Sequence, residues 1–188
     1  MHFSFLHPRE QLVAIMDRIY RNGMTTLSGG NLSIREENGD VWITPAGVDK
    51  GSLLPQDIVL VRADGTVEGS HRPSSEYPFH RAIYSQRPDL GAVVHAHAAA
   101  LITFSIARQV PATNIIPQAR RVCGPVGCAS YAMPGSEALG RNIAETFGKG
   151  FQVVLLENHG VAAGGPDLLT AFQRLETLDF CARTEIRA

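Results

Sequence analysis

Two short turns, Asn38-Gly39 and Asp64-Gly65, constrain the fold of this chain most, because each stands between two short apolar segments. Such dipeptides readily adopt the backbone angles that a tight β-hairpin needs. The segments that they join are residues 32–35 with 41–44 and residues 58–62 with 66–68. Each pair is therefore predicted to form two neighbouring antiparallel strands, since a parallel connection needs about a dozen residues or more.

A third hairpin is predicted where the turn Asn158-His159-Gly160 joins residues 151–157 to residues 161–163. Between these strands, apolar residues recur at helical spacing or flank helix-start and helix-stop signals. The predicted helices span about residues 10–20, 73–87, 98–107, 135–147 and 166–182, and a further buried strand spans 91–97. Serine is expected to cap the second helix, and Pro166 to lie in the first turn of the last. The fold class is α/β, with helices on the faces of a mixed, mainly antiparallel sheet.

The length and composition fit a single domain that spans residues 1–188. A net charge of -1 gives no general field that would attract nucleic acid or an anionic membrane, so neither is expected as a partner. The apolar segments are too short to cross a bilayer, and the first eight residues lack the features of a signal peptide. Three cysteines without a C-x-x-C pair also favour a cytoplasmic protein.

The strongest local sign of chemistry is the segment His95-Ala96-His97 at the end of an apolar strand. Residues two apart in a strand point to the same side, so both imidazoles can reach one metal ion at a Zn–N distance of about 2.0–2.1 Å. His159, which follows another apolar strand, would supply the third nitrogen of a catalytic zinc site. The alternatives are two separately hydrogen-bonded histidines and, at position 159, an ordinary hairpin residue.

Glu76 is the carboxylate that we pair with these histidines. It is expected in the first turn of its helix, where the helix dipole favours a negative charge, although a glutamate there is also a common capping residue. Three segments of small, polar residues could converge into a cradle for a phosphate group, because exposed backbone N–H groups bind anions. These segments are the loop at Ser28, Gly30 and Asn31, the turn from Thr44 to Gly47, and Ser74 with Ser75. Each segment alone is usually just a turn.

Lysines are scarce, since Lys50 and Lys149 are the only two among 17 basic residues. Both lie beside glycine in segments that are expected to be exposed turns. A Schiff-base aldolase needs a lysine desolvated in an apolar pocket, so aldol chemistry in this chain is expected to use a metal ion as electron sink. The sequence also lacks the G-x-S-x-G segment of many hydrolases and the P-loop of nucleotide-binding proteins.

Five segments, in this order, resemble the class II aldolase/adducin family. They are Ser28-Gly-Gly-Asn-Leu-Ser33, Ile43-Thr-Pro-Ala-Gly47, Pro73-Ser-Ser-Glu76, Val94-His-Ala-His97 and Glu157-Asn-His-Gly160. The resemblance spans about residues 10–180. It is to members like L-fuculose-phosphate aldolase, because the epimerase of the family usually has aspartate at the position of Glu76.

The resemblance implies a three-layer α/β/α sandwich around a mainly antiparallel sheet, and a homotetramer with active sites near subunit interfaces. It implies that His95, His97 and His159 bind zinc, and that Glu76 is the fourth ligand at rest and the acid/base once substrate displaces it. The residues that it places around the substrate phosphate are Ser28, Asn31, Thr44, Gly47, Ser74 and Ser75.

Two departures from L-fuculose-phosphate aldolase bear on specificity. That enzyme has a tyrosine, which reaches across the subunit interface, in the segment that here reads 111–117 and contains no tyrosine. Asn114 cannot protonate a leaving group as tyrosine can, so the second proton donor stays open. Relatives also often have an aromatic C-terminal tail that closes over the site, whereas this sequence ends at Ala188.

The predicted function is that of a zinc-dependent aldehyde-lyase of carbohydrate metabolism, with manganese or cobalt as alternative ions. It would cleave a small phosphorylated sugar or sugar acid through a zinc-stabilised enediolate. Decarboxylation of a sugar-acid phosphate, 4-epimerisation of a ketose phosphate and dehydration remain alternatives within the family, because they pass through related intermediates. The rivals from other classes are a hydrolase that uses the same histidines and a non-catalytic, adducin-like interaction module.

Overall fold

The computed structural model describes residues 3–188; Met1 and His2, which begin the segment considered for a signal peptide, lie outside the described residues. The strands are β1 (Asn31–Arg35), β2 (Val41–Ile43), β3 (Val59–Val61), β4 (Val67–Glu68), β5 (Ala92–Ala96), β6 (Val126–Ala129), β7 (Val153–Leu156) and β8 (Gly160–Gly165). They form one sheet in the order β4-β3-β2-β1-β5-β8-β7-β6. Neighbouring strands are antiparallel except β6 and β7, so the predicted mixed, mainly antiparallel sheet is confirmed.

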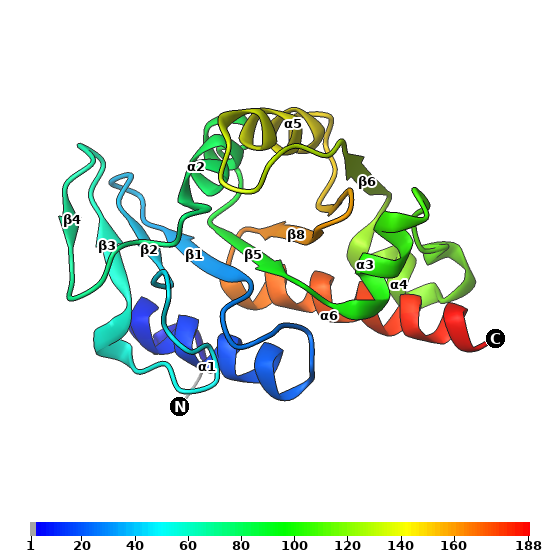
Figure 1. Cartoon of the computed structure of the whole chain (residues 1–188), viewed down its shortest axis with the longest axis horizontal. Helices are drawn as coiled ribbons and strands as arrows, with labels where there is room; N and C mark the ends of the chain where they lie inside the picture. Colours follow the sequence, from blue (N-terminus) through cyan, green and yellow to red (C-terminus); the bar gives the residue numbers. More distant parts are fainter. Residues whose placement is uncertain (1–2) are drawn as a thin grey trace.

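Helices cover both faces of this sheet, as Figure 1 shows. One face carries α1 (Pro8–Arg21), α3 (Ala99–Ile106), α4 (Pro117–Cys123) and α6 (Leu168–Arg187), and the other carries α2 (Tyr77–Gln86) and α5 (Glu137–Gly148). Short 3-10 helices span Phe3–Phe5, Pro55–Asp57 and Thr113–Ile115. The three-layer α/β/α sandwich is therefore confirmed. Within the described residues, no helix is both long and apolar enough to span a membrane.

Alternate residues of β5 point into two different cores, as the pleat of a strand requires. Val94 and Ala96 pack with Leu32 in the core that α1 and α6 cover. Val93 packs with Ile83 in the core that α2 and α5 cover. His95, two residues after Val93, is fully buried. The pleat of the strand thus turns this polar side chain toward the layer of α2.

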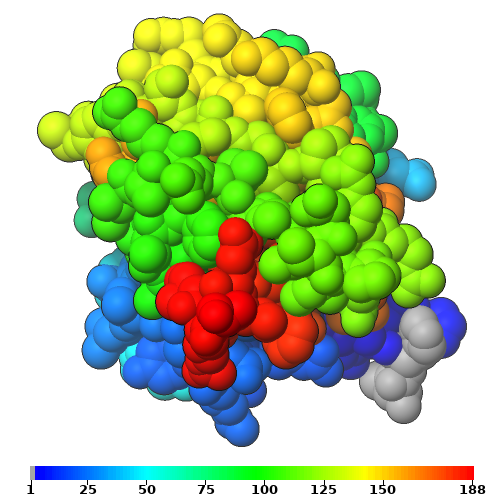
Figure 2. Space-filling model, turned by 90° about the vertical axis from the view of Figure 1, so that its right-hand side faces the viewer, coloured from blue at the N-terminus to red at the C-terminus, as the bar shows by residue number. Residues whose placement is uncertain are grey.

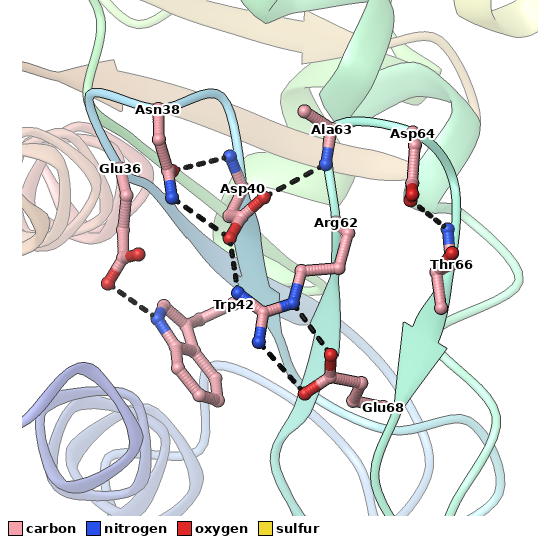
Figure 3. Close-up of polar contacts among 9 residues, drawn as sticks. All are labelled: Glu36, Asn38, Asp40, Trp42, Arg62, Ala63, Asp64, Thr66 and Glu68. Carbon is pink, nitrogen blue, oxygen red and sulfur yellow. Dashed lines mark hydrogen bonds and ion pairs between the residues drawn. The ribbon is translucent and has the colours of Figure 1, made fainter.

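The two predicted hairpins at one edge of the sheet are present, and Arg62 links them (Figure 3). Its Nη1 donates to Oδ2 of Asp40 over 2.7 Å, and its Nε donates to Oε1 of Glu68 over 2.7 Å. Asp40 also accepts a hydrogen bond from the N–H of Ala63. The Arg62 guanidinium holds the pKa of both carboxyl groups below their usual range. These contacts fix β2, β3 and β4 relative to one another.

The start of α2 differs from the prediction. The helix begins at Tyr77, no side chain caps it, and Glu76 is the N-cap residue and not part of the first turn. The chain is still extended at Pro73, which forms a β-bridge with Pro45. The N–H of Ser74 then donates to the carbonyl oxygen of Thr44, so the sheet edge holds this segment and delays the helix.

The last helix also begins later than predicted. Asp167 is its N-cap and accepts a hydrogen bond from the N–H of Thr170, so Pro166 precedes the cap and does not lie in the first turn. Among the α-helices and strands of the described residues, α4 and β6 escaped prediction altogether. The segment that contains them is short, interrupted by glycine, and has no clear apolar period.

Candidate metal centre

The structure brings together Glu76, His95, His97 and His159, each of which offers one ligand atom within 4.8 Å of all the others. Nε2 of His95 lies 3.1 Å from Nε2 of His97 and 3.2 Å from Oε2 of Glu76. Oε1 of Glu76 lies 3.3 Å from Nε2 of His159. Tetrahedral zinc with bonds of about 2.0–2.1 Å separates its ligand atoms by about 3.3 Å. The spacing therefore fits a four-coordinate divalent ion.

The order of the strands explains how residues so far apart in sequence meet. His95 lies in β5 and His97 directly after it, and β8 is the neighbour of β5, with Ala96 opposite Val161. The turn that carries His159 therefore lies beside the end of β5. A Cβ atom at Gly160 would lie 2.6 Å from the carbonyl oxygen of Ala96, so only glycine permits this approach.

The hydrogen bond of His95 fixes which of its ring nitrogens can bind a cation. Nδ1 lies 2.9 Å from the carbonyl oxygen of Val161, and a carbonyl can only accept, so Nδ1 carries the proton. Nε2 of His95 then faces Oε2 of Glu76 with a lone pair against a carboxylate oxygen. This contact is repulsive unless a cation or a proton lies between the two atoms.

Two buried atoms of the cluster lack a hydrogen-bond partner among the described residues. They are Oε1 of Glu76 and Nδ1 of His159. Buried polar groups are normally paired, and a carboxylate oxygen among three imidazoles without a donor is an exception that needs a cause. A divalent cation would satisfy both the oxygen and the facing lone pairs, so the residues present fit a metal ion.

Electrostatics places the cluster in its cation-binding form at neutral pH. Burial, together with the neighbouring imidazoles, lowers the pKa of His97 to about 4 and lowers that of His159 as well. Burial alone would raise the pKa of Glu76, but His95, the amide of Asn31 and His159 together hold it below its usual range. The carboxylate is therefore ionised while His97 and His159 are neutral.

A buried chain of hydrogen bonds lies behind Glu76. Nδ2 of Asn31 donates to Oε2 of Glu76 over 2.7 Å, so Oδ1 of Asn31 must accept from Nε2 of His80, 2.5 Å away. Nδ1 of His80 then accepts from the hydroxyl of Ser33, which also contacts the hydroxyl of Tyr84. Burial lowers the pKa of His80 to about 3, and the neutral ring suits these two roles. The direction of every hydrogen bond from His80 to Glu76 is thus determined.

His80 was not among the predicted site residues. It follows Glu76 by four positions and stands between Phe79 and Ile83 on the buried side of α2. A histidine on an otherwise apolar helix face, one turn after a candidate acid/base, was the signal that could have revealed it. Asn31, predicted to bind phosphate, has both ends of its amide engaged by Glu76 and His80.

A cavity of about 420 Å³ opens beside the cluster, which is within the usual range of about 300–1,000 Å³ for small-molecule sites. Glu76, His97 and His159 form one side of it. Five of the six predicted phosphate-binding residues line it, namely Ser28, Asn31, Gly47, Ser74 and Ser75. The sixth, Thr44, is fully buried behind the cavity, and its hydroxyl accepts from the N–H of Leu32.

Lys50 contradicts the prediction that both lysines are exposed. Lys149 is exposed, but Lys50 is 3% exposed and lines the same cavity. Its Nζ donates to the carbonyl oxygen of Pro45 over 2.6 Å. The segment 49–51 does turn, but the turn directs the lysine side chain inward, between the cradle and α1. Burial lowers the pKa of Lys50 to about 8, and Asp49 opposes this shift.

Comparisons with a family model, with known sequences and with solved structures agree with one another. The model of the Class II Aldolase and Adducin N-terminal domain matches residues 10–186. The chain is 36% identical to the 5-deoxy-D-ribulose 1-phosphate aldolase of Bacillus thuringiensis serovar kurstaki, over 93% of this chain and 82% of that one. It is 32% identical to the 3-oxo-tetronate 4-phosphate decarboxylase of Escherichia coli (strain K12), over 93% and 84%. A solved structure of an L-fuculose 1-phosphate aldolase, 33% identical, superposes with a TM-score of 0.87 over 96% of this chain and 85% of the other.

Proposed function

Because the chain belongs to the class II aldolase and adducin family and is a lyase of the aldolase kind, we propose that it cleaves a small phosphorylated sugar or sugar acid. The observation that carries the proposal is the Glu76 carboxylate, which is buried against three imidazoles at one side of a cavity of small, polar residues. A catalytic metal site combines such a ligand set with an open side for the substrate.

In this proposal His95, His97 and His159 hold the ion, which is zinc, with manganese or cobalt as alternatives, and Glu76 is the fourth ligand at rest. A divalent ion held there supplies a Lewis acid that stabilises negative charge on substrate oxygen atoms. Glu76 is the group that accepts and returns a proton. Its Oε1 has no hydrogen-bond partner among the described residues, whereas Oε2 is held by Asn31, so Oε1 is the atom available for the proton.

The cradle binds the phosphate group of the substrate. Ser28, Ser74, Ser75 and Gly47 line the same cavity as Glu76, His97 and His159, and they offer hydroxyl and backbone N–H groups as donors. Thr44 supports this wall from behind, since its carbonyl oxygen accepts from the N–H of Ser74. Asn31 contributes mainly by holding Glu76.

The names of the relatives support a phosphorylated substrate but more than one reaction. The protein from Bacillus thuringiensis is an aldolase, and the one from Escherichia coli is a decarboxylase of an oxo-acid phosphate. Aldol cleavage is our main proposal. Decarboxylation is the second candidate, because the decarboxylase from Escherichia coli aligns with the same share of this chain, 93%, as the aldolase does. Epimerisation and dehydration remain alternatives. An adducin-like interaction module would not need the four ligand residues together.

The proposal is tested by metal analysis and by an activity screen. Purified protein should hold about one divalent ion per chain, His97→Ala should lose it, and His71→Ala, outside the cluster, should keep it. The screen covers phosphorylated ketoses and four-carbon sugar acids with zinc, manganese and cobalt, and follows exchange of a substrate C–H proton with deuterium from solvent. Activity that survives complete metal removal would refute the proposal, and cleavage without C–H exchange would favour a hydrolase.

We also propose that the chain assembles as a homotetramer. Side chains of Ile106, Ile115, Phe180 and Ile186 are each more than half exposed, on α3, the 3-10 helix Thr113–Ile115 and α6. These elements gather on the face that Figure 2 shows, where the red end of α6 emerges between the green segments. Large exposed apolar side chains on neighbouring elements are typical of subunit contacts. Sedimentation of the purified protein tests the assembly.

A single domain spanning residues 1–188 and a cytoplasmic location complete the proposal. The two cores lie on opposite faces of one continuous sheet, which supports one domain. Cys123, Cys128 and Cys181 are all free thiols, which suits a reducing compartment.

A further inference from the structure

Lys50 is a buried cation that forms no ion pair with any described residue, since the neighbouring Asp49 carboxylate stabilises its charge without contacting it. Its side chain is 3% exposed, and none of the ion pairs among residues 3–188 includes it. An ammonium group has three N–H donors, and one of them is directed to the carbonyl oxygen of Pro45. A buried charge without a directly contacting counter-charge is costly, so a lysine in this position indicates that an anion from elsewhere binds beside it.

The place of Lys50 shows where that anion would lie. Its N–H donates to the carbonyl oxygen of Leu27, next to Ser28, and its Nζ donates to Pro45, two residues before Gly47. One residue therefore joins two of the three cradle segments, through its backbone and through its side chain. Among the described residues that line the cavity, Lys50 is the only lysine or arginine.

The other cradle groups cannot neutralise a phosphate monoester. Serine hydroxyls and backbone N–H groups donate hydrogen bonds but carry no net charge, whereas a phosphate monoester carries about -1.5 to -2 charges at neutral pH. Glu76, which also lines the cavity, would repel such a group wherever the metal ion does not offset its charge. A positive charge within the cradle would therefore add an attraction for the phosphate that the neutral donors do not supply.

We propose that Lys50 supplies the positive charge that binds the phosphate group of the substrate and thereby selects phosphorylated over unphosphorylated sugars. The proposal rests on the proposed function for the kind of anion. The lysine here acts as a fixed charge and forms no covalent bond with the substrate.

The test measures the affinity of the metal-loaded protein for inorganic phosphate by isothermal titration calorimetry. Lys50→Met removes the charge and keeps an apolar stem, and should weaken binding about tenfold or more, since hydrogen bonds to charged groups contribute at that level. Lys50→Arg keeps the charge, and cavities on both sides of the side chain leave room for a guanidinium group, so it should bind within about fivefold of wild type. Lys149→Met, at the exposed lysine, is the matched control and should bind like wild type.

A further variant distinguishes a purely structural role of Lys50 from a role of its positive charge. Lys50→Gln is neutral but retains an N–H donor for Pro45, so it should weaken phosphate binding as Lys50→Met does while its thermal unfolding stays close to that of wild type. This variant also serves if Lys50→Met does not fold. Phosphate affinity of Lys50→Gln equal to that of wild type, or a loss in Lys50→Arg as large as in Lys50→Met, would overturn the proposal.

The metal content of every variant is also measured, so that a failure of this proposal can be distinguished from a failure of the proposed function. Among the described residues, Lys50 forms no hydrogen bond or ion pair with any of the four cluster residues, so the Lys50 variants should hold the same amount of metal as wild type. A wild-type protein that holds metal but does not bind phosphate would refute the role of Lys50 and leave the metal centre standing. A metal-free protein that binds phosphate through Lys50 would refute the metal centre alone.

Discussion

Asn31 donates a hydrogen bond from Nδ2 to Oε2 of Glu76 over 2.7 Å, and the opposite end of its amide accepts from His80. Because both ends are engaged, the amide cannot turn over without losing two buried hydrogen bonds. The orientation of the candidate acid/base therefore depends on His80, whose side chain hydrogen-bonds to Asn31 and to Ser33. Such supporting partners commonly matter nearly as much as the groups that touch the substrate.

Replacing His80 should impair turnover more than substrate binding. In His80→Phe the amide of Asn31 loses the partner that fixes it, so Glu76 can rotate, and kcat should fall about 10- to 100-fold. The KM for the substrate should change little, because the cradle is untouched. His71→Phe, on a partly exposed histidine that pairs with Asp57, is the control. Unchanged kcat in a folded, metal-loaded His80→Phe protein would contradict this role.

The buried, neutral state of His80 also predicts how stability depends on pH. Its pKa is about 3 in the folded protein and about 6.5 when unfolded, so between these values the unfolded state binds more protons. The contribution of the neutral His80 to the free energy of unfolding is complete above about pH 6.5 and is lost as the pH falls toward 3, by an amount on the order of 5 kcal/mol. Urea unfolding of metal-free protein at several pH values measures this. The dependence should be weaker in His80→Phe, and identical curves for the two proteins would exclude His80 as its source.

Local signals in the sequence were enough to predict the parts of the fold that depend on neighbouring residues. The turns at Asn38-Gly39 and Asp64-Gly65 specify their hairpins, because Gly39 and Gly65 adopt the positive φ angles that these turns need. The alternation of the strand at 91–97 likewise indicated that His95 and His97 point the same way. In the structure their Nε2 atoms lie 3.1 Å apart.

Features that depend on distant contacts could not be predicted in the same way. Asp49-Lys50-Gly51 does form a turn, but only the packing of the cradle against α1 buries the lysine. The late start of α2 depends on a β-bridge between Pro45 and Pro73, which no local pattern reveals. The position of β5 between β1 and β8 is likewise set by the whole sheet, and it explains why His159 meets His95.

Gly160 should be essential for the metal centre although it offers no ligand. In Gly160→Ala the added Cβ would lie 2.6 Å from the carbonyl oxygen of Ala96, so the turn must move away from β5 and take His159 with it. Metal affinity should fall about tenfold or more. Competition with a chelator measures it. Gly148→Ala, whose Cβ would meet only Gln86 at 3.5 Å, is the control, and equal affinities in the two variants would disprove the steric argument.

Lys50 should not form a Schiff base, even though it is buried beside the site. Its Nζ is directed to the carbonyl oxygen of Pro45, and a pKa of about 8 leaves most of the amine protonated at pH 7. Treatment with borohydride in the presence of dihydroxyacetone phosphate should therefore leave the mass of the protein unchanged. An adduct on the peptide that contains Lys50 would show that lysine chemistry operates after all.

The order of the strands has a consequence for how the protein matures. β5 pairs with β1, about 60 residues earlier in the chain, and with β8, about 70 residues later, so the ligand residues meet only after both long loops have closed. A nascent chain that stops before β8 carries His95 and His97 but not His159. Tight metal uptake should therefore mark the end of folding and not its beginning. Metal added to a refolding mixture would then act by trapping completed molecules and not by nucleating them.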